Sequence, residues 1–325
     1  MNDTAKERRT ASRPAAGQVS YVTVGPDSAG QRLDNFLLRL AKGVPQSHVY
    51  RIVRSGQVRV NRARASADQR LAEGDQVRLP PLRLAAPTPP PVRAQMPPVL
   101  FEDEHLIVVD KPAGLAAHGG SGIAHGLIEM VRAARPNQPF LELAHRLDRE
   151  TSGILLLAKT RRALLGLHEQ LREGLVDKRY LALVAGDWVN DRQHVRLPLA
   201  KRTTAGGERR VSVDEDEGQA AHTVFNLRHR YGPFSLLEAE LKTGRTHQIR
   251  VHLGHVGFPI VGDGKYGDFE LNRRVARGEF GVPLRRMFLH ACATRFVHPV
   301  SGVQMAIDSA LDRECSDFLR GLGRA

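Results

Sequence analysis

The densest cluster of ionisable and hydroxyl side chains in the sequence is AHRLDRETSG, residues 144–153. Asp148 lies there between Arg146 and Arg149, and hydroxyl side chains follow it. Cations and hydroxyl donors can hold a carboxylate in its ionised form, and a turn between two apolar segments often carries function. The alternative is structural, because an Asp before Thr-Ser-Gly commonly ties its own turn through a side-chain hydrogen bond. From composition alone, the structural alternative is favoured.

A second concentration of charge contains arginines and no acidic residue. It comprises Arg51, Arg54, Arg59, Arg62 and Arg64. Guanidinium groups bind phosphates through charge-assisted, often bidentate contacts and release counterions. A solvated helix face is the ordinary alternative for such charges. Their clustering on one short helix, turn and extended segment instead favours a nucleic-acid partner.

The charge balance of the whole chain points to a polyanionic partner. Its 325 residues include 48 Lys and Arg against 35 Asp and Glu, which gives a net charge of +13 with His neutral and a pI near 10.4. Residues 1–98 hold 16 basic and 7 acidic side chains, a net of +9, whereas residues 99–325 hold 32 and 28, a net of +4. The N-terminal part therefore supplies most of the positive field.

Composition also excludes several classes of protein. Apolar residues make up 41% of the chain and charged residues 26%, which excludes wholesale disorder. The longest apolar run, at residues 180–185, is far shorter than the ~20 residues of a membrane span. Residues 1–25 lack the apolar core of a secretory signal. We therefore expect a cytoplasmic protein without a membrane partner.

Motifs for metals and cofactors are weak. Cys292 and Cys315 belong to no CxxC pair, which argues against a disulfide framework or a zinc site. His247 and His252 have no carboxylate or cysteine partner in a metal-binding pattern. The GGSG at residues 119–122 lacks the Lys-Ser/Thr of a phosphate-binding loop. The sequence thus predicts no metal and no cofactor.

Prolines divide the chain into roughly two domains. Eight of the 19 prolines fall within residues 80–98, where missing amides and a fixed φ exclude a helix or a central strand. Apolar residues at helical spacing before this stretch predict a compact unit with two short helices. The predicted parts are a disordered or extended segment at 1–29, a small domain at 30–80, a semi-rigid linker at 81–98 and a larger domain at 99–325.

The larger domain alternates short apolar segments with turns. Extended segments are predicted at residues 105–110, 153–159, 178–184, 221–227, 234–241 and 246–252. Amphipathic helices are predicted at residues 161–173 and 308–322. Strands outnumber helices, so the domain is expected to be α+β with a mixed, largely antiparallel sheet.

The small domain resembles the S4 RNA-binding domain. The likeness rests on GQRLDNFLLRL, VPQSHVYRIVRSGQVRVNRAR and EGDQVRLP. It implies that the two short helices and the adjoining turn dock on structured RNA. The cluster of arginines falls within these elements.

The segment HRLDRETSGILLLAKT resembles the signature of the pseudouridine synthases of the large-subunit rRNA type. Three further stretches agree with it, namely VDKPAGLAAHGGSG, VDKRYLALVAG and TGRTHQIRVHLGHVGFPIVGDGKYG. The resemblance, with the S4-like part, spans most of residues 30–310. It implies flanking helices, a central cleft and an isomerase that converts uridine to pseudouridine. Nothing is oxidised and no atom is lost, so the reaction needs no cofactor.

The resemblance assigns roles to four side chains. It places the catalytic aspartate at Asp148, the arginine that faces it at Arg250, and the tyrosine that stacks on the target uracil at Tyr180. Arg146 matches an arginine that fills the space left by the flipped-out nucleotide. Without the resemblance, Arg250 would be interpreted as a surface residue on an edge strand at 246–252. Tyr180 would be interpreted as a half-buried strand residue, and Arg146 as a plain phosphate contact.

The resemblance therefore implies an enzyme that isomerises specific uridines of 23S rRNA, and a monomer is our working assumption, since the sequence does not reveal the oligomeric state. The S4-like domain would bind the RNA and the larger domain would carry the chemistry. A tRNA uridine is the alternative substrate. One alternative outside this class of enzyme is a non-catalytic RNA-binding or ribosome-assembly factor, and the presence of Asp148, Tyr180 and Arg250 argues against it. The other is a phosphate-binding transferase, which rests only on the GGSG loop.

Overall fold

The computed structural model of the protein describes residues 18–41, 44, 46–81, 96–119, 126–203 and 209–323. The chain forms two compact units, one of residues 1–93 with 136–140 and one of residues 94–135 with 141–325. The predicted linker falls largely at residues 82–95, outside the described residues, and so does GGSG beyond Gly119. Among the residues that the structure describes, no helix is both long and apolar enough to cross a bilayer.

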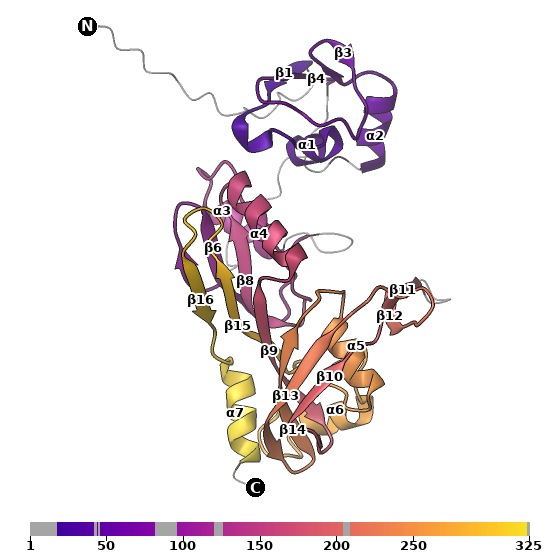
Figure 1. Cartoon of the computed structure of the whole chain (residues 1–325), viewed down its shortest axis with the longest axis vertical. Helices are drawn as coiled ribbons and strands as arrows, with labels where there is room; N and C mark the ends of the chain where they lie inside the picture. The colour runs from indigo at the N-terminus through magenta and orange to yellow at the C-terminus, as the bar shows by residue number, and fades with distance from the viewer. Residues whose placement is uncertain are drawn as a thin grey trace, which may run out of the picture. The chain divides into compact units, whose positions relative to one another are not determined.

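The first unit is a four-stranded antiparallel sheet with two helices (Figure 1). Its strand order is β1-β4-β2-β3. The elements are β1 (Ser20–Thr23), η1 (Pro26–Ser28), α1 (Leu33–Leu40), α2 (Gln46–Arg54), β2 (Arg59–Val60), β3 (Ala63–Arg64) and β4 (Gln76–Leu79). Apolar side chains at helical spacing on α1 pack with those of one sheet face into a single core.

The first strand lies outside the predicted bounds of the small domain, which were residues 30–80. Strand β1 pairs with β4, and Val22 and Val24 are buried in the common core. Strand β1 has only four residues, so its alternating pattern is a weak sequence signal for a strand beside the stronger helical pattern that follows. The unit thus begins earlier in the chain than the sequence indicated.

The second unit is built on a ten-stranded sheet of order β10-β13-β14-β9-β15-β8-β6-β5, with β16 beside β15 and β7 beside β8. Its strands are β5 (Val99–Glu102), β6 (Leu106–Lys111), β7 (Glu142–Leu143), β8 (Ser152–Ala158), β9 (Asp177–Ala185), β10 (Arg192–Val195), β13 (Thr223–Tyr231), β14 (Phe234–Leu241), β15 (Leu289–Val297) and β16 (Gln304–Asp308). Only the β15–β8 pair is parallel among the described pairings of this sheet. The predicted mixed, largely antiparallel sheet is therefore confirmed.

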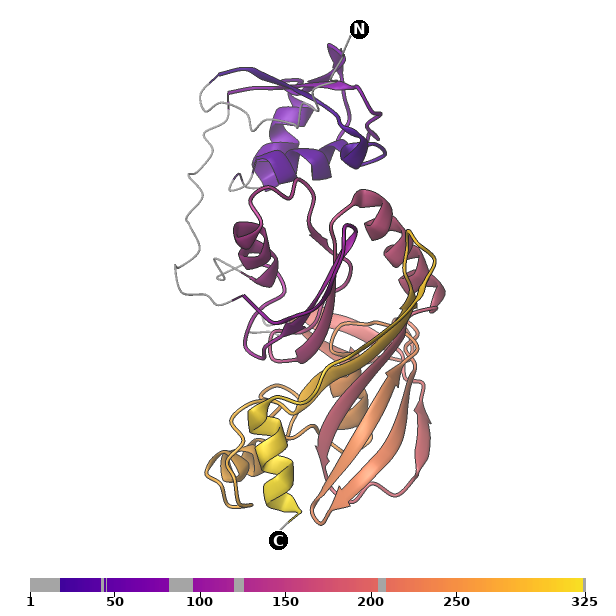
Figure 2. The same cartoon turned by 90° about the vertical axis from the view of Figure 1, so that its left-hand side faces the viewer.

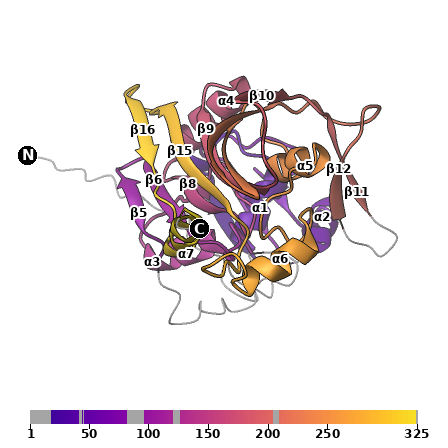
Figure 3. The same cartoon turned by 90° about the horizontal axis from the view of Figure 1, so that it is seen from below.

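Helices flank this sheet, and a separate hairpin joins them. The elements are α3 (Leu127–Ala134), α4 (Arg161–Glu173), β11 (Leu199–Thr203), β12 (Arg209–Val213), α5 (Gln248–His255), α6 (Phe269–Ala276) and α7 (Arg313–Leu322). Figure 2 shows α6 and α7 gathered at the end of the sheet near the C-terminus, where they share a core with β14. Figure 3 shows α5 on the concave side of the curved strands β13 and β14.

Two predicted elements differ from the structure. The segment 246–252 was predicted to be extended, but it leads into helix α5. The helix is buried on nearly every side, so its sequence lacks the 3.6-residue amphipathic period by which a helix is predicted. The alternation of Ile249 and Val251 with polar residues remained, and this pattern predicts a strand. The C-terminal helix begins at Arg313 and not at residue 308, because the Asp312 side chain caps it and β16 precedes it.

Candidate active site

The turn that carries Asp148 leads directly into β8. Its main-chain bond runs from the Thr151 amide to the Asp148 carbonyl at 3.2 Å. Gly153, at φ 105°, lets β8 approach β15, since a Cβ there would lie 2.3 Å from the Ala291 carbonyl oxygen. The Asp148 carboxylate instead accepts a hydrogen bond from Arg250 Nη1, with its Oδ2 at 3.1 Å. The carboxylate thus bonds to a side chain far along the chain and not to its own turn, which favours a functional over a structural interpretation of Asp148.

A buried acid fixes the guanidinium of Arg250. Asp263 accepts bonds from Arg250 Nε at 2.7 Å and from Nη2 at 2.8 Å, which is a bidentate pair. Arg250 is 7% exposed and Asp263 only 1%. Burial opposes ionisation of Asp263, but the hydrogen bonds and charge of Arg250 outweigh it and hold the pKa of Asp263 below its usual value. Nη1 is therefore presented to Asp148 in a fixed direction.

The sequence did not identify Asp263 as a partner of Arg250. It lies in GDGKYG, a turn-rich segment inside the stretch that carries the family resemblance. Oδ1 also accepts bonds from the amides of Lys265 and Tyr266, at 2.8 Å and 3.0 Å. The acid thus orders its own loop and the arginine together.

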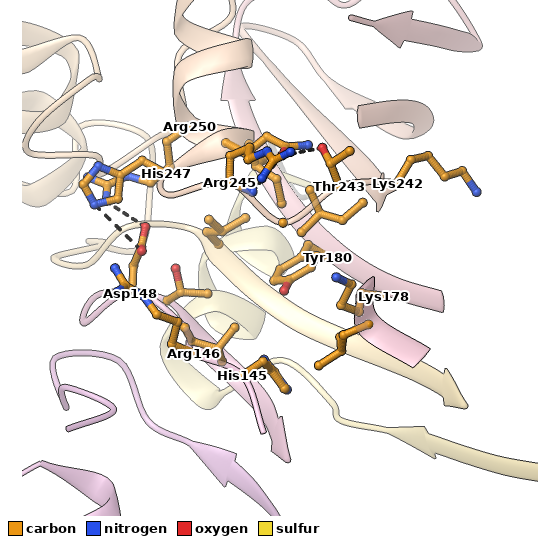
Figure 4. Close-up of a pocket in the computed structure, with 18 of the residues that line it drawn as sticks. His145, Arg146, Asp148, Lys178, Tyr180, Lys242, Thr243, Arg245, His247 and Arg250 are labelled. Carbon is orange, nitrogen blue, oxygen red and sulfur yellow. Dashed lines mark hydrogen bonds and ion pairs between the residues drawn. The ribbon is translucent and has the colours of Figure 1, made fainter. Parts of the chain in front are cut away.

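Tyr180 comes from β9 and lines the same cleft as Asp148, which has a volume of about 510 Å³ (Figure 4). Its side chain is largely buried, with 7% of the residue exposed. Burial, together with the negative charge of Asp148, raises the pKa of its phenol above the usual value. The hydroxyl therefore stays protonated at neutral pH, and the ring borders the cavity.

The charge that lines this cleft is strongly one-sided. Asp148 is the only carboxylate among its described lining residues, whereas six cations border it: Arg146, Arg172, Lys178, Lys242, Arg245 and Arg250. Arg146 is exposed and has no ion-pair partner among the described residues. Lys178 is half-buried, and this burial lowers its pKa. Such a cleft attracts a phosphate chain and leaves one acid for chemistry.

His247 is a neighbour of Asp148 that the sequence classified as a strand histidine. It precedes α5 with a left-handed backbone, φ 54°, and its Nε2 lies 3.8 Å from Asp148 Oδ1. Its Nδ1 lies 2.8 Å from the hydroxyl of Tyr266, whose ring lies 5.1 Å from the Arg250 guanidinium carbon. Burial lowers the pKa of His247, and the charge of Asp148 opposes this. Figure 4 shows His247 facing Asp148.

No cluster of three or more His, Cys, Asp or Glu side chains suited to a metal ion occurs within the described parts of the chain. The five predicted RNA-binding arginines lie in the first unit, on α2 and on the strands and turn that follow. All five are exposed and none forms an ion pair there with a described acid. Asp148, Tyr180, Arg250 and Arg146 are the predicted site residues that the second unit brings together.

Lys111 braces the turn that carries Asp148 from inside the core. It is fully buried, and its Nζ donates to the carbonyls of Pro112, Leu115 and Arg149 at 2.9, 2.8 and 3.0 Å. Burial and the charge of Arg286 lower its pKa to about 7, while the three acceptors favour the ammonium form. Lys111 thereby ties the end of β6 to the residue that follows Asp148.

Replacing Lys111 by Met should destabilise the second unit by about 2–4 kcal/mol, because three main-chain carbonyls lose the donor that the buried ammonium supplies. Urea unfolding followed by the fluorescence of Trp188 would measure this, since Trp188 is the only tryptophan of the chain and is buried in that unit. Lys201→Met, at an exposed position, is the matched control. Equal unfolding midpoints for both variants would contradict the proposed bracing role.

Comparison with known proteins identifies the class of this fold and site. Residues 105–255 match the family model of RNA pseudouridylate synthases, and residues 31–77 match the S4 domain. The protein named ribosomal large subunit pseudouridine synthase C is 47% identical in Escherichia coli (strain K12), over 94% of this chain and 98% of the relative. Its namesake in Yersinia pestis is 48% identical, over 94% and 96%. The chain therefore belongs to the RNA pseudouridine synthases and carries an S4 domain.

A solved structure agrees with this assignment. The human protein titled RNA Pseudouridylate Synthase Domain Containing 4 superposes with a TM-score of 0.55 at 26% sequence identity. The match covers 69% of this chain and 92% of the human one. The predicted family, its α+β fold and its enzymatic class are thus confirmed.

Proposed function

We propose that the protein converts specific uridines of 23S rRNA to pseudouridine, acting as a cytoplasmic monomer with Asp148 as the catalytic carboxylate. The observation that carries the proposal is an acid hydrogen-bonded to a fixed guanidinium in a cleft whose other charged side chains, among the described residues, are Lys and Arg. The cations would hold the phosphate chain on either side of a flipped-out nucleotide. The ribosomal names of relatives that match nearly the whole chain support the large-subunit RNA as substrate.

In this reaction the bond from ribose to the base nitrogen breaks, the uracil turns, and a carbon of the base bonds to the ribose. The hydrogen on that carbon leaves and the nitrogen gains one, so the atoms balance. Asp148 would act at the sugar carbon, where a carboxylate stabilises or captures positive charge. The Tyr180 ring would stack on the uracil, and Arg146 would occupy the vacated position in the RNA stack.

The substrate can be tested by incubating the protein with unmodified 23S rRNA and, separately, with unmodified tRNA. Carbodiimide treatment and primer extension then map each pseudouridine. New stops at discrete positions of 23S rRNA are expected, with none in tRNA. Modification of tRNA alone would favour the alternative substrate, and no product in either RNA would contradict the proposal.

A further inference from the structure

We propose that the open face of the S4 sheet binds unpaired nucleotides of the RNA, with a base stacked on Tyr21 and phosphates held by Arg78, Arg59 and Arg62. This rests on the proposed function, since it assumes an RNA substrate. It assigns a second surface to the unit, apart from the arginines of α2.

The register of the sheet aligns four side chains in one row across its strands. Tyr21 lies opposite Arg78, Arg78 opposite Arg59, and Arg59 opposite Arg64. Directly paired residues of antiparallel strands point to the same face of a sheet. Val22, Val77 and Val60, at the next positions, are buried in the core. The row therefore lies on the outer face.

The three arginines of this row are tethered without being neutralised. Arg78 Nη1 donates to the Gln57 carbonyl at 2.7 Å, and Arg59 Nη1 donates to the Arg62 carbonyl at 3.2 Å. Arg64 Nη2 donates to a main-chain carbonyl as well. None of the three pairs with a carboxylate of the described residues. Their positions are fixed while their charge and remaining donors stay available for an anion.

The face beside the row is hollowed by about 460 Å³. The described side chains that line the hollow are Tyr21, Gln57, Arg59, Arg62, Gln76 and Arg78, and no carboxylate is among them. Asn61 and Arg62 adopt left-handed backbone angles, φ 50° and 70°, as the tight turn between β2 and β3 requires. This turn places the guanidinium of Arg62 at the hollow, beside those of Arg59 and Arg78.

Tyr21 decides which form of RNA fits. It is 64% exposed. An exposed aromatic ring beside arginines is a stacking platform for a base, and each stacked base adds affinity without sequence preference. A duplex offers no free base face to such a ring, because its bases already stack on one another. The surface therefore fits single-stranded RNA.

The test measures the affinity of the full-length protein for a labelled single-stranded RNA and for a blunt RNA duplex by fluorescence anisotropy. Tyr21→Ala should weaken binding to the single strand about 10-fold and leave duplex binding unchanged, whereas Tyr21→Phe, which keeps a ring, should bind like the parent. Arg78→Gln should weaken single-strand binding and reduce the slope of log affinity against log salt by about 0.7.

Arg70→Gln is the matched control for Arg78→Gln. Arg70 is exposed, lies in the same unit and also donates to a main-chain carbonyl, that of Gly30, but it does not line the hollow. Equal affinities for Tyr21→Ala and Tyr21→Phe, or equal effects of the two glutamine variants, would overturn the inference. Pseudouridine formation by the parent protein, measured in parallel on 23S rRNA, reports separately on the proposed function.

Discussion

Replacing Asp148 by Asn is expected to reduce pseudouridine formation by at least about 10³-fold, as loss of a catalytic carboxylate does in other enzymes. Asn keeps the size of the side chain and can still accept the 3.1 Å bond from Arg250 Nη1. It cannot stabilise or capture positive charge at the ribose. Arg250 retains its buried partner Asp263, so the fold should persist.

RNA affinity should be unchanged or slightly higher in this variant. Asp148 is the only carboxylate among the described lining residues of a cleft bordered by six cations, so its removal lessens repulsion of phosphates. Release of tritium from the uracil carbon that forms the new bond measures the rate in a single turnover, and filter binding measures affinity. Asp187→Asn, at a side chain that is 71% exposed, is the control. Retention of more than a tenth of the parent rate would contradict a catalytic role.

The sequence could single out Asp148, the proposed catalytic acid, because its signal is local. Asp148, its neighbouring arginines and the following buried strand form one continuous motif. The type of sheet was predictable for the same reason, since long strands such as β8 and β14 carry continuous or alternating apolar patterns. Short edge strands such as β5 carry too few residues for a pattern to be distinguished.

The partners of Asp148 were less predictable because they depend on long-range packing. Arg250 lies 102 residues further along the chain, and the resemblance supplied it while its element was predicted as a strand. Only the helical form of α5 directs its guanidinium to Asp263 on one side and Asp148 on the other. His247 and Asp263 were therefore missed, since no local pattern distinguishes them from an ordinary histidine and a turn aspartate.

Replacing Arg250 by Met is expected to abolish activity and to make stability fall as the pH rises between about 4 and 7, a range in which the contribution of Asp263 to the stability of the parent protein is constant. In the parent protein the pKa of Asp263 lies below its unfolded value near 3.9, because Arg250 outweighs the effect of burial. Its contribution to stability is present above that value and is lost as the pH falls through the folded pKa. Acid therefore weakens the parent protein through this group.

In Arg250→Met, Asp263 stays buried but loses its two bonds from the guanidinium, and keeps those from the amides of Lys265 and Tyr266. Its folded pKa should then lie above the unfolded value, so stability is highest in acid and falls as the pH rises through the folded pKa. At neutral pH the expected loss is about 3–5 kcal/mol, as for other buried pairs that lose one partner. Urea unfolding at several pH values, followed by Trp188 fluorescence, would measure both effects.

The double variant Arg250→Met with Asp263→Asn separates stability from catalysis. A neutral amide in place of the Asp263 carboxylate would need no counter-ion, so most of the stability lost at neutral pH should return. Activity should not return, because nothing then holds a cation against Asp148. Arg250→Lys keeps the charge but cannot form the bidentate pair, and we expect it to retain intermediate activity. Recovery of activity in the double variant would show that the guanidinium serves only to neutralise Asp263. It would contradict the proposed role of Arg250 in positioning and stabilising the Asp148 carboxylate.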